Sequence, residues 1–486
     1  IRADRIATAR DRLNPTFRLE ARQRRPDARR LDPEGRAGAH QFGDGERRRS
    51  AGVEQIENEH PRAHPSGIGR VYYIAFCVHI RQYMQQIRWE RKMLPLDGVT
   101  VIDLTSVVAG PLATQIMAQQ GARVWKVEPP EGDRARLLGA VAAPGFSSAH
   151  VALNADKQSV AIDLARADGQ ALLRRMVPQA DLLIHNFRPG VMERLGLGTD
   201  VLHALRPDLV IARISGFGQD GPMAGGRAYD PIVQAESGMV SWTAEGPLLA
   251  PQWICDKTAG LYAAQAATAA LVARAHSGKG AVVDISMLEA AVAYGWIDLH
   301  GAQAFPDATS RMPDIAAVYR PWATGDGWIV VVMLSQSEFE GWARAIGAPD
   351  LLADPRFADM TTRFLNWDDL RAISAPRIAA LSTREAVARL ADAGVPCGVA
   401  NRSAALPGHA QIVHDGFVAL TDHPQAGAVR RTRPVARFDG ARPGFEAHAP
   451  RVGEHSRAVL AAAGLTPEEI ETAIAEGAAC VPEETL

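Results

Sequence analysis

Residues 99–128 read VTVIDLTSVVAGPLATQIMAQQGARVWKVE, and the order of elements in this stretch settles the fold class. The apolar run 99–104 predicts a buried strand, 110–121 a helix and 122–128 a second strand. Two parallel strands joined through a helix form a right-handed crossover. We therefore expect a βαβ unit here.

The alternation of strand and helix continues beyond this unit. We expect helices at 166–177 and 199–206, and strands at 181–187 and 209–216. Strands that alternate with helices imply a mostly parallel sheet, with ligands bound at the carboxyl ends of the strands. The predicted fold class is α/β, with a large Rossmann-like domain whose first part is residues 93–305.

Polar and charged side chains follow the predicted strands at the edge where ligands bind. The loop VVAGP (107–111) opens the first helix, so its N–H groups are placed to meet a phosphate or a carboxylate. The later segments EPPEGDRAR (128–136) and NFRPGVMERLG (186–196) supply Arg134, Arg136, Asn186, Phe187, Arg188 and Arg194. Cations beside an aromatic ring suit a nucleotide with several phosphates and an adenine. For each arginine alone, a solvated surface charge is the alternative.

One carboxylate, Asp256, precedes an alanine-rich helix that we predict from Lys257 to about His276. Asp is a favoured N-cap residue, and the N-terminal end of a helix favours its ionised form. Such a carboxylate is a candidate nucleophile; a capping residue without chemistry is the alternative. We expect backbone N–H groups from Thr258 to Gly260 to stabilise its charge and a developing oxyanion.

Seven motifs follow one another along the chain. They are LPLDGVTVIDLTSVVAGPLATQIMAQQGARVWKVEPPEGDRAR (94–136), NADKQSVAIDL (154–164), NFRPGVMERLG (186–196), ISGFGQDGP (214–222), WICDKTAGLYAAQAATAALVARAHSGKGAVVDISMLEA (253–290), GVPCGVANRSAAL (394–406) and APRVGEHSRAVLAAAGL (449–465). In this order, the chain from Met93 onward resembles the family III CoA-transferases, which include formyl-CoA and carnitine CoA-transferases and have the α-methylacyl-CoA racemases as relatives.

The resemblance implies roles for individual residues. Asp256 falls on the position of the family's catalytic aspartate. Coenzyme A, as acyl-CoA, would be a substrate and not a tightly bound cofactor. The positions that match the CoA-contacting motifs are Ala109, Arg136, Lys157, Asn186, Phe187 and Arg194.

Tyr229 bears on the choice between the two chemistries of the resembled proteins. The racemases carry a His in this segment, whereas a Tyr with a pKa near about 10 is a poor base at neutral pH. Tyr229 therefore favours CoA transfer, in which Asp256 forms an acyl anhydride and then an enzyme–CoA thioester that a carboxylate acceptor receives. A racemase or isomerase is one alternative, and a non-catalytic acyl-CoA-binding protein is another.

Val108 and Tyr229 are the residues that we expect in the substrate pocket. Formyl-CoA transferase has a Gln in the segment that matches Val108. Oxalate and formate are therefore disfavoured as substrates, and an apolar Val108 allows a larger acyl group.

The first 92 residues differ from the rest in charge. They hold 20 Arg and Lys against 12 Asp and Glu, a net charge of +8, whereas the remainder is 33 against 43, or −10. With few regular apolar positions, 1–92 is expected to be a poorly ordered basic extension. Its interleaved acids disfavour a nucleic-acid-binding tail, and the apolar run 71–80 is too short to span a bilayer. We expect neither a nucleic-acid nor a membrane partner.

The four cysteines, Cys77, Cys255, Cys397 and Cys480, lie far apart and lack the spacing of a metal site. We therefore expect no metal and a reduced, cytoplasmic protein. Cys255 adjoins Asp256 but has no His partner nearby in sequence, so a small buried residue is favoured over a thiol nucleophile.

A smaller α+β domain is expected at 306–404. The stretch 321–335 predicts a β-hairpin around Asp326-Gly327, and 337–347 an amphipathic helix. The resemblance of 449–465 to the family's closing segment implies that residues 405–486 then return to pack on the large domain. The resemblance implies that two such chains form an interlocked homodimer.

Overall fold

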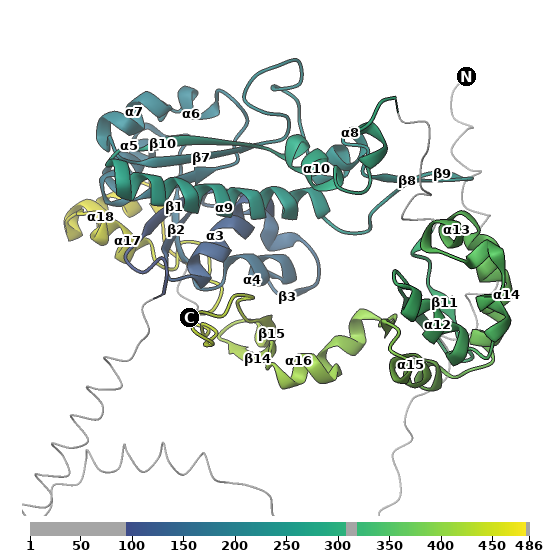
Figure 1. Ribbon diagram of the computed structural model, residues 1–486. Helices are drawn as coiled ribbons and strands as arrows, with labels where there is room; N and C mark the ends of the chain where they lie inside the picture. The colour runs from purple at the N-terminus through teal and green to yellow at the C-terminus, as the bar shows by residue number, and fades with distance from the viewer. Residues whose placement is uncertain (1–93, 308–317, 483–486) are drawn as a thin grey trace, which may run out of the picture. The chain divides into compact units, whose positions relative to one another are not determined.

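The computed structural model describes residues 94–307 and 318–482. The predictions for the extension 1–92, the run 71–80 and Cys77 fall outside these residues. Within them the fold is α/β, which confirms the predicted class (Figure 1). None of the described helices has both the length and the apolar character that crossing a membrane requires.

Seven strands form the central sheet. Across the sheet they are β10 (Ala281–Ser286), β7 (Val210–Ser215), β6 (Leu182–His185), β1 (Thr100–Leu104), β2 (Arg123–Glu128), β5 (Gln158–Ile162) and β16 (Ala479–Cys480). The first six are parallel, and β16 runs antiparallel to β5. The chain extends the sheet on one side of β1 through β2 and β5, then on the other side through β6, β7 and β10. The chain order thus reverses between β1 and β6, which is where doubly wound proteins bind ligands.

Helices cover both faces of the sheet, since neighbouring residues on a strand point to opposite faces. Val101 and Leu182 belong to one core, and Ile102 and Leu183 to the other. The first core packs against α3 (Ala109–Gln119), α8 (Asp230–Glu236), α9 (Ile254–Ser277) and α10 (Met287–Gly295). The second includes residues of α5 (Ala167–Met176), α6 (Val191–Arg194), α7 (Thr199–Leu205), α17 (Ser456–Ala462) and α18 (Pro467–Ala475).

A third core draws its buried residues from Val318 to Val395 alone. It contains the antiparallel strands β11 (Trp322–Ala323), β12 (Trp328–Val331) and β13 (Cys397–Val399) with α12 (Gln336–Ala345), α13 (Met360–Leu365), α14 (Trp367–Ala379) and α15 (Thr383–Asp392). The hairpin around Asp326-Gly327 is present, because β11 pairs with β12 on either side of it. The helix predicted at 337–347 is α12, which Ser335 and Glu338 begin with a capping box.

The last part of the chain completes the central sheet. Through β16 it pairs with β5, and Val459 and Leu460 of α17 lie in the same core as β5. Its other elements are β14 (Val418–His423), β15 (Gly427–Thr432) and α16 (Ala410–His414). The remaining short elements are α4 (Ser148–Asn154), β3 (Val141–Ala143), β4 (Phe146–Ser147), β8 (Val240–Thr243), β9 (Gly246–Leu249), η2 (Arg134–Leu137), η3 (Val177–Gln179), η4 (Gly301–Gln303), η5 (Pro349–Leu352), η6 (Pro355–Phe357) and η7 (Ser403–Gly408).

Candidate active site

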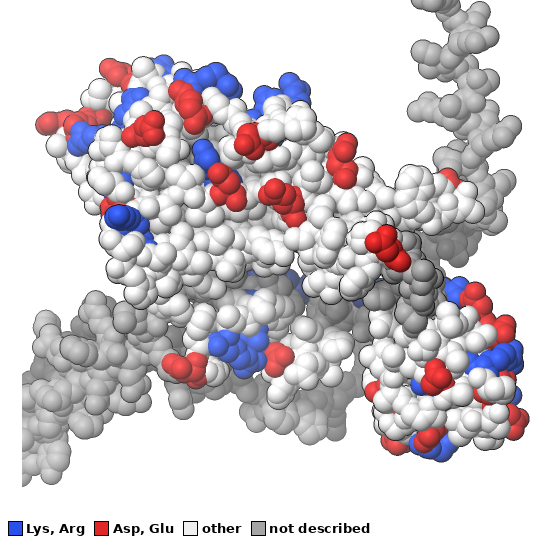
Figure 2. Space-filling model, turned by 45° about the horizontal axis from the view of Figure 1, so that its top comes forward, with Lys and Arg blue, Asp and Glu red and all other residues white. Residues whose placement is uncertain are grey.

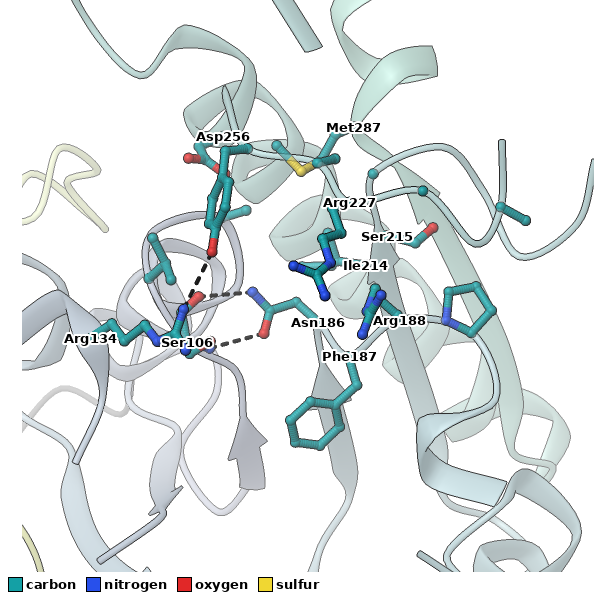
Figure 3. A pocket seen from close by; sticks show the side chains of 18 residues that line it. Ser106, Arg134, Asn186, Phe187, Arg188, Ile214, Ser215, Arg227, Asp256 and Met287 are labelled. Carbon is teal, nitrogen blue, oxygen red and sulfur yellow. Dashed lines mark hydrogen bonds between the residues drawn. The ribbon is translucent and has the colours of Figure 1, made fainter. Parts of the chain in front are cut away.

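A cavity of about 470 Å³ opens where β1 and β6 end (Figure 3). Leu104 of β1 pairs with His185 of β6, so the loops that leave these two strands start level with each other. The cavity walls come from those loops, from the start of η2 after β2, from the end of β7 and the segment after it, and from the first turns of α9 and α10. The residues that carry its chemistry are Ser106, Val107, Ala109, Arg134, Asn186, Phe187, Arg188, Arg227, Tyr229, Asp256 and Met287.

The loop after β1 is held on two sides. The Asn186 side chain accepts a hydrogen bond from Ser106 N at 2.9 Å and donates one to Ser106 O at 2.8 Å. On the other side, Val107 N donates to Asp133 Oδ1 at 3.0 Å. Val107 has φ 72°, a left-handed conformation that is strained for a β-branched residue. This strain marks the loop as a segment that the surrounding contacts force into place.

Asp256 is not the N-cap that we expected. Helix α9 begins at Ile254, its N-cap is Trp253 without a side-chain cap, and Asp256 lies in the first turn. The helix approaches α3 closely at Gly260, where a Cβ atom would stand 2.6 Å from Ala109 O. The absence of a side chain at Gly260 thus lets the carboxylate-bearing helix pack beside the loop and helix that follow β1.

We expected the N–H groups of Thr258 to Gly260 to lie free at the start of the helix, and this expectation is wrong. Because α9 starts at Ile254, only its first four N–H groups lack a partner within the helix. Thr258 and the residues after it lie in the following turn, where their N–H groups bond to helix carbonyls. The N–H of Asp256 itself donates to Asp230 Oδ2 at 2.9 Å.

The electrostatics around Asp256 oppose the expectation of an ordinary ionised carboxylate. Burial, and secondly the negative charge of Asp230, raise the pKa of Asp256 to about 7. The Asp230 side chain is itself buried and lies at the start of α8. The carboxylate of Asp256 is therefore more basic than a surface aspartate, and a more basic carboxylate is a stronger nucleophile.

Three arginines bring positive charge to the same cavity. Arg134, Arg188 and Arg227 all line it (Figure 3), and within the described parts of the chain none of the three forms an ion pair with a carboxylate. Arg134 Nη1 donates to the Tyr229 hydroxyl at 3.4 Å. The cavity thus combines free guanidinium groups, which suit phosphates and carboxylates, with one basic carboxylate.

Lys157 and Arg136 lie behind this wall and do not line the cavity. The Lys157 side chain is fully buried, and its ammonium contacts Asp103, Thr114, Asn154 and the Pro111 carbonyl. Arg136 is buried as well and pairs with Glu128 at 2.6 Å. These cations fix the ends of β1 and β2; the structure places the exposed arginines, and not these two, at the cavity.

Comparison with known proteins identifies the family and the fold. The model of CoA-transferase family III matches residues 96–456. The chain belongs to that family. This CoA-transferase is 33% identical over 395 residues to an acyl-CoA transferase of Fusarium pseudograminearum, covering 77% of the chain and 86% of that protein. It is 32% identical to the succinyl-CoA–D-citramalate CoA-transferase of Chloroflexus aurantiacus, covering 78% and 97% of the two. A CaiB/BaiF family protein of Brucella suis has a TM-score of 0.67 at 30% identity, covering 76% and 100% of the two chains.

Some of the remaining predicted site residues of this CoA-transferase line the cavity and others do not. Ala109, Asn186, Phe187 and Tyr229 line the cavity. Arg194 lies on α6 and does not line the cavity. Val108, which is buried at the start of α3, does not line the cavity either. Val107, which adopts the left-handed conformation, lines the cavity in place of Val108.

The segment between β7 and α8 supplies residues that we did not predict. Arg227 lines the cavity and Asp230 contacts the backbone of Asp256. A signal was available, since the segment follows a predicted strand and contains GFGQDG (216–221). That spacing matches the dinucleotide-binding G-x-G-x-x-G, but α8 starts only at Asp230, so the motif does not open a helix as that motif requires.

Cys255 of this CoA-transferase is buried, and burial raises the pKa of its thiol to about 12. A thiol of that pKa is a poor nucleophile at neutral pH. Among residues 94–307 and 318–482 there is no group of three or more His, Cys, Asp or Glu side chains that could hold a metal ion.

Proposed function

We propose that this enzyme transfers coenzyme A from an acyl-CoA thioester to a carboxylic acid, with Asp256 as the covalent nucleophile. The observation that carries the proposal is the placement of a basic carboxylate in a cavity with three unpaired arginines, at the point of the sheet where ligands bind. An anionic ligand would be held by the arginines while Asp256 reacts with it.

The covalent path has two steps in each direction. Asp256 attacks the thioester carbonyl, the C–S bond breaks, and CoA leaves as a thiolate, which gives a mixed anhydride. The thiolate then attacks the Asp256 carbonyl carbon, and the donor acid leaves as a carboxylate. The enzyme now carries CoA as an aspartyl thioester, which an acceptor carboxylate converts to a new acyl-CoA by the reverse steps. Splitting the exchange in this way lowers the barrier of each part.

Different residues of the cavity would contact different parts of CoA. Arg134, Arg188 and Arg227 would contact phosphates or a carboxylate, and Phe187 would stack against the adenine. Ala109 and Asn186 would complete the wall, with Lys157 and Arg136 holding it from behind. Arg194 remains a candidate contact for a phosphate that extends beyond the cavity, and Val107, with Tyr229, would border the acyl group in place of Val108.

The names of relatives suggest the first substrates to test. They act on succinyl-CoA with D-citramalate, glutarate or L-malate, and on acetyl-CoA with oxalate. A dicarboxylate carries a second anionic group, which the unpaired arginines of the cavity could bind. We therefore propose succinyl-CoA as donor and a dicarboxylic acid as acceptor.

The test is to trap the intermediate. Wild-type enzyme is incubated with succinyl-CoA and treated with hydroxylamine or borohydride; we expect a hydroxamate or an alcohol on the peptide that contains Asp256. Asp256→Asn should lose transfer by well over tenfold, which is more than about 1.4 kcal/mol of barrier. Asp200→Asn is the matched control, since Asp200 also lies in the first turn of a helix but outside the cavity. A label on Cys255, or near-normal transfer by Asp256→Asn, would contradict the proposal.

A racemase or isomerase is the second candidate, and one observation favours it. A carboxyl with a pKa of about 7 is suited to proton transfer at neutral pH. Tyr229 lines the same cavity, but a phenol is a weak base for proton abstraction from the opposite face. Deuterium incorporation at the α-carbon of a branched acyl-CoA in D₂O would support this function; its absence under conditions of active CoA transfer would exclude it.

We further propose that the enzyme is a homodimer. Large apolar side chains are exposed at Ile297 (90%), Trp242 (77%) and Phe305 (72%). On the face shown in Figure 2, charged side chains are scattered between broad areas without charge. Large exposed apolar side chains of this kind are the ones that a protein interface buries. Sedimentation should give twice the chain mass, and Ile297→Asp should weaken the association; a wild-type monomer at micromolar concentration would refute the proposal.

We also propose a cytoplasmic location. Cys255, Cys397 and Cys480 are all free thiols, which suits a reducing compartment. Fractionation of the source cells with an antibody against the enzyme would test this directly.

A further inference from the structure

Asp230 contacts the proposed nucleophile through the backbone. Its Oδ2 accepts the N–H of Asp256 at 2.9 Å, and its Oδ1 accepts from Gln234 Nε2 at 2.5 Å. Gln234 in turn accepts from Ala250 N at 2.9 Å and donates to Gln252 O at 3.1 Å. The buried pair Asp230 and Gln234 therefore ties α8 to the segment that leads into α9 and fixes the first turn of that helix.

No cation offsets the charge of Asp230 in the part of the chain that the structure describes: Asp230 forms no ion pair there, and its partners are the Gln234 side-chain amide and the Asp256 backbone N–H. The elements around Asp256 contribute few other charges. Helix α3 has no ionisable side chain, α8 adds the exposed Glu236 and α10 the exposed Glu289.

The other ionisable groups near Asp256 have separate partners or face the cavity. On α9 itself, Lys257 donates to Gln252 Oε1 at 3.0 Å, and the Cys255 thiol is buried. Tyr229 and the arginines Arg134, Arg188 and Arg227 line the cavity. Burial and the charge of Asp230 are the two causes that act on the Asp256 carboxyl, and both disfavour its ionised form. Two carboxylates thus lie close together without a cation between them.

We propose that Asp230 is a positioning residue whose negative charge drives Asp256 into its covalent states. This inference rests on the proposed function, because it assumes that Asp256 is acylated. When Asp256 attacks the thioester, its charge passes to the departing CoA thiolate, and the anhydride that remains on the enzyme is neutral. In the second step the charge leaves with the donor carboxylate, and the enzyme–CoA thioester is again neutral.

Each covalent state therefore relieves the repulsion between Asp230 and Asp256. Free Asp256 carries that repulsion whenever it is ionised, so the free enzyme is raised in free energy relative to both intermediates. Removing the charge of Asp230 should lower the energy of the free carboxylate and leave the intermediates almost unchanged. The enzyme–CoA thioester should then make up a smaller fraction of the enzyme at equilibrium.

The test compares two variants that break the same hydrogen-bond network. Asp230→Asn removes the charge and can still accept the Asp256 N–H, whereas Gln234→Met removes the amide and keeps the charge. We expect Asp230→Asn to shift the acid limb of the kcat/KM profile down by about one pH unit and to reduce the thioester fraction about tenfold, since one pKa unit is a factor of ten. Intact-protein mass spectrometry with succinyl-CoA measures that fraction. Gln234→Met should leave the limb in place, whatever its effect on rate.

The possible results separate cleanly. An unchanged limb in Asp230→Asn, or an equal shift in Gln234→Met, would overturn the proposal, because a structural role alone moves rates and not the titration. If Asp230→Asn does not fold, the wild-type enzyme still provides a test: acylation of Asp256 must lose half its rate near pH 7, and a limb near pH 4, about the value for an unperturbed Asp, would also overturn it. Absence of any label on wild-type Asp256 would instead refute the proposed function.

Discussion

Replacing Lys157 by Met should destabilise the protein by about 3–5 kcal/mol, the cost of removing one partner of a buried ion pair. The Lys157 ammonium lies 3.1 Å from Asp103 Oδ2 and 2.7 Å from Thr114 Oγ1, and both charged side chains are fully buried. Met fills much the same volume, so the packing of the stem is largely kept. The loss is then that of a buried carboxylate without its cation, together with the Pro111 and Asn154 oxygens left without their donor.

Urea denaturation followed by tryptophan fluorescence measures this loss. With a slope of about 3 kcal/mol per molar urea, the midpoint should fall by roughly 1–2 M. The double variant Asp103→Asn/Lys157→Met should cost less than the sum of the two single variants, because each single variant leaves an unpaired buried charge and the double variant leaves none. That non-additivity separates a lost ion pair from a general packing defect.

Lys157→Met should affect acyl-CoA binding much less than it affects stability. Since the Lys157 ammonium points into the interior, the KM for acyl-CoA should change less than about threefold, or roughly 0.7 kcal/mol. Arg227→Gln, at the cavity wall, should show the opposite pattern: stability within about 0.5 kcal/mol of wild type and a KM raised about tenfold or more. A Lys157→Met protein of normal stability with a strongly raised KM would refute this reasoning and return Lys157 to the CoA site.

Three further outcomes follow from the site. The proposed mechanism requires ionised Asp256, whose pKa is about 7, so kcat/KM should rise about tenfold from pH 6 to pH 8, which initial-rate assays would show; a flat profile would contradict the raised pKa. At pH 8, Asp256→Asn should be more stable than wild type by about 1–3 kcal/mol. The full rise in the pKa of Asp256, about three units, would correspond to roughly 4 kcal/mol, but its side chain is partly exposed, which reduces the effect. Unfolding returns the pKa of Asp256 to about 4, so the stability advantage of Asp256→Asn should grow as pH rises from about 4 to 7 and vanish below pH 4. An advantage in thermal melts that does not depend on pH would contradict this explanation. Val107→Gly should leave the melting temperature unchanged or raised, as it relieves the strained φ of 72°, whereas Val107→Ala should give no such relief.

The fold was predictable because its strands are short apolar runs separated by helices. The residues from Val101 to Leu104 are buried on both faces of the sheet, so their pattern is continuous and easy to read. The cavity edge was predictable for the same reason, since Asn186 and Phe187 directly follow such a strand. What a strand end cannot reveal is whether a cation there faces the ligand or the interior.

Lys157 and Arg136 show what a sequence motif does not reveal about the surroundings of a charged side chain. The resemblance to CoA-contacting motifs predicted a ligand contact for both, whereas the structure buries them behind the cavity wall. Their burial depends on partners that only the folded chain supplies: Asp103 lies 54 residues before Lys157. The same holds for the start of α9. An Asp before an alanine-rich run reads as an N-cap, but the acceptor for the first-turn N–H is Asp230, 26 residues earlier in the chain.

The replacement of a local cap by a distant carboxylate has a functional consequence. A capping Asp256 would have its oxygens bound to its own helix, which would stabilise the anion and weaken it as a nucleophile. With Asp230 accepting the N–H of Asp256, the Asp256 side chain is released toward the cavity, and a second negative charge lies beside it. On the proposed mechanism, the repulsion between the two carboxylates is relieved when Asp256 loses its charge by acylation. The proposed function thus assigns the guanidinium groups of the cavity to binding and the carboxylate of Asp256 to reaction.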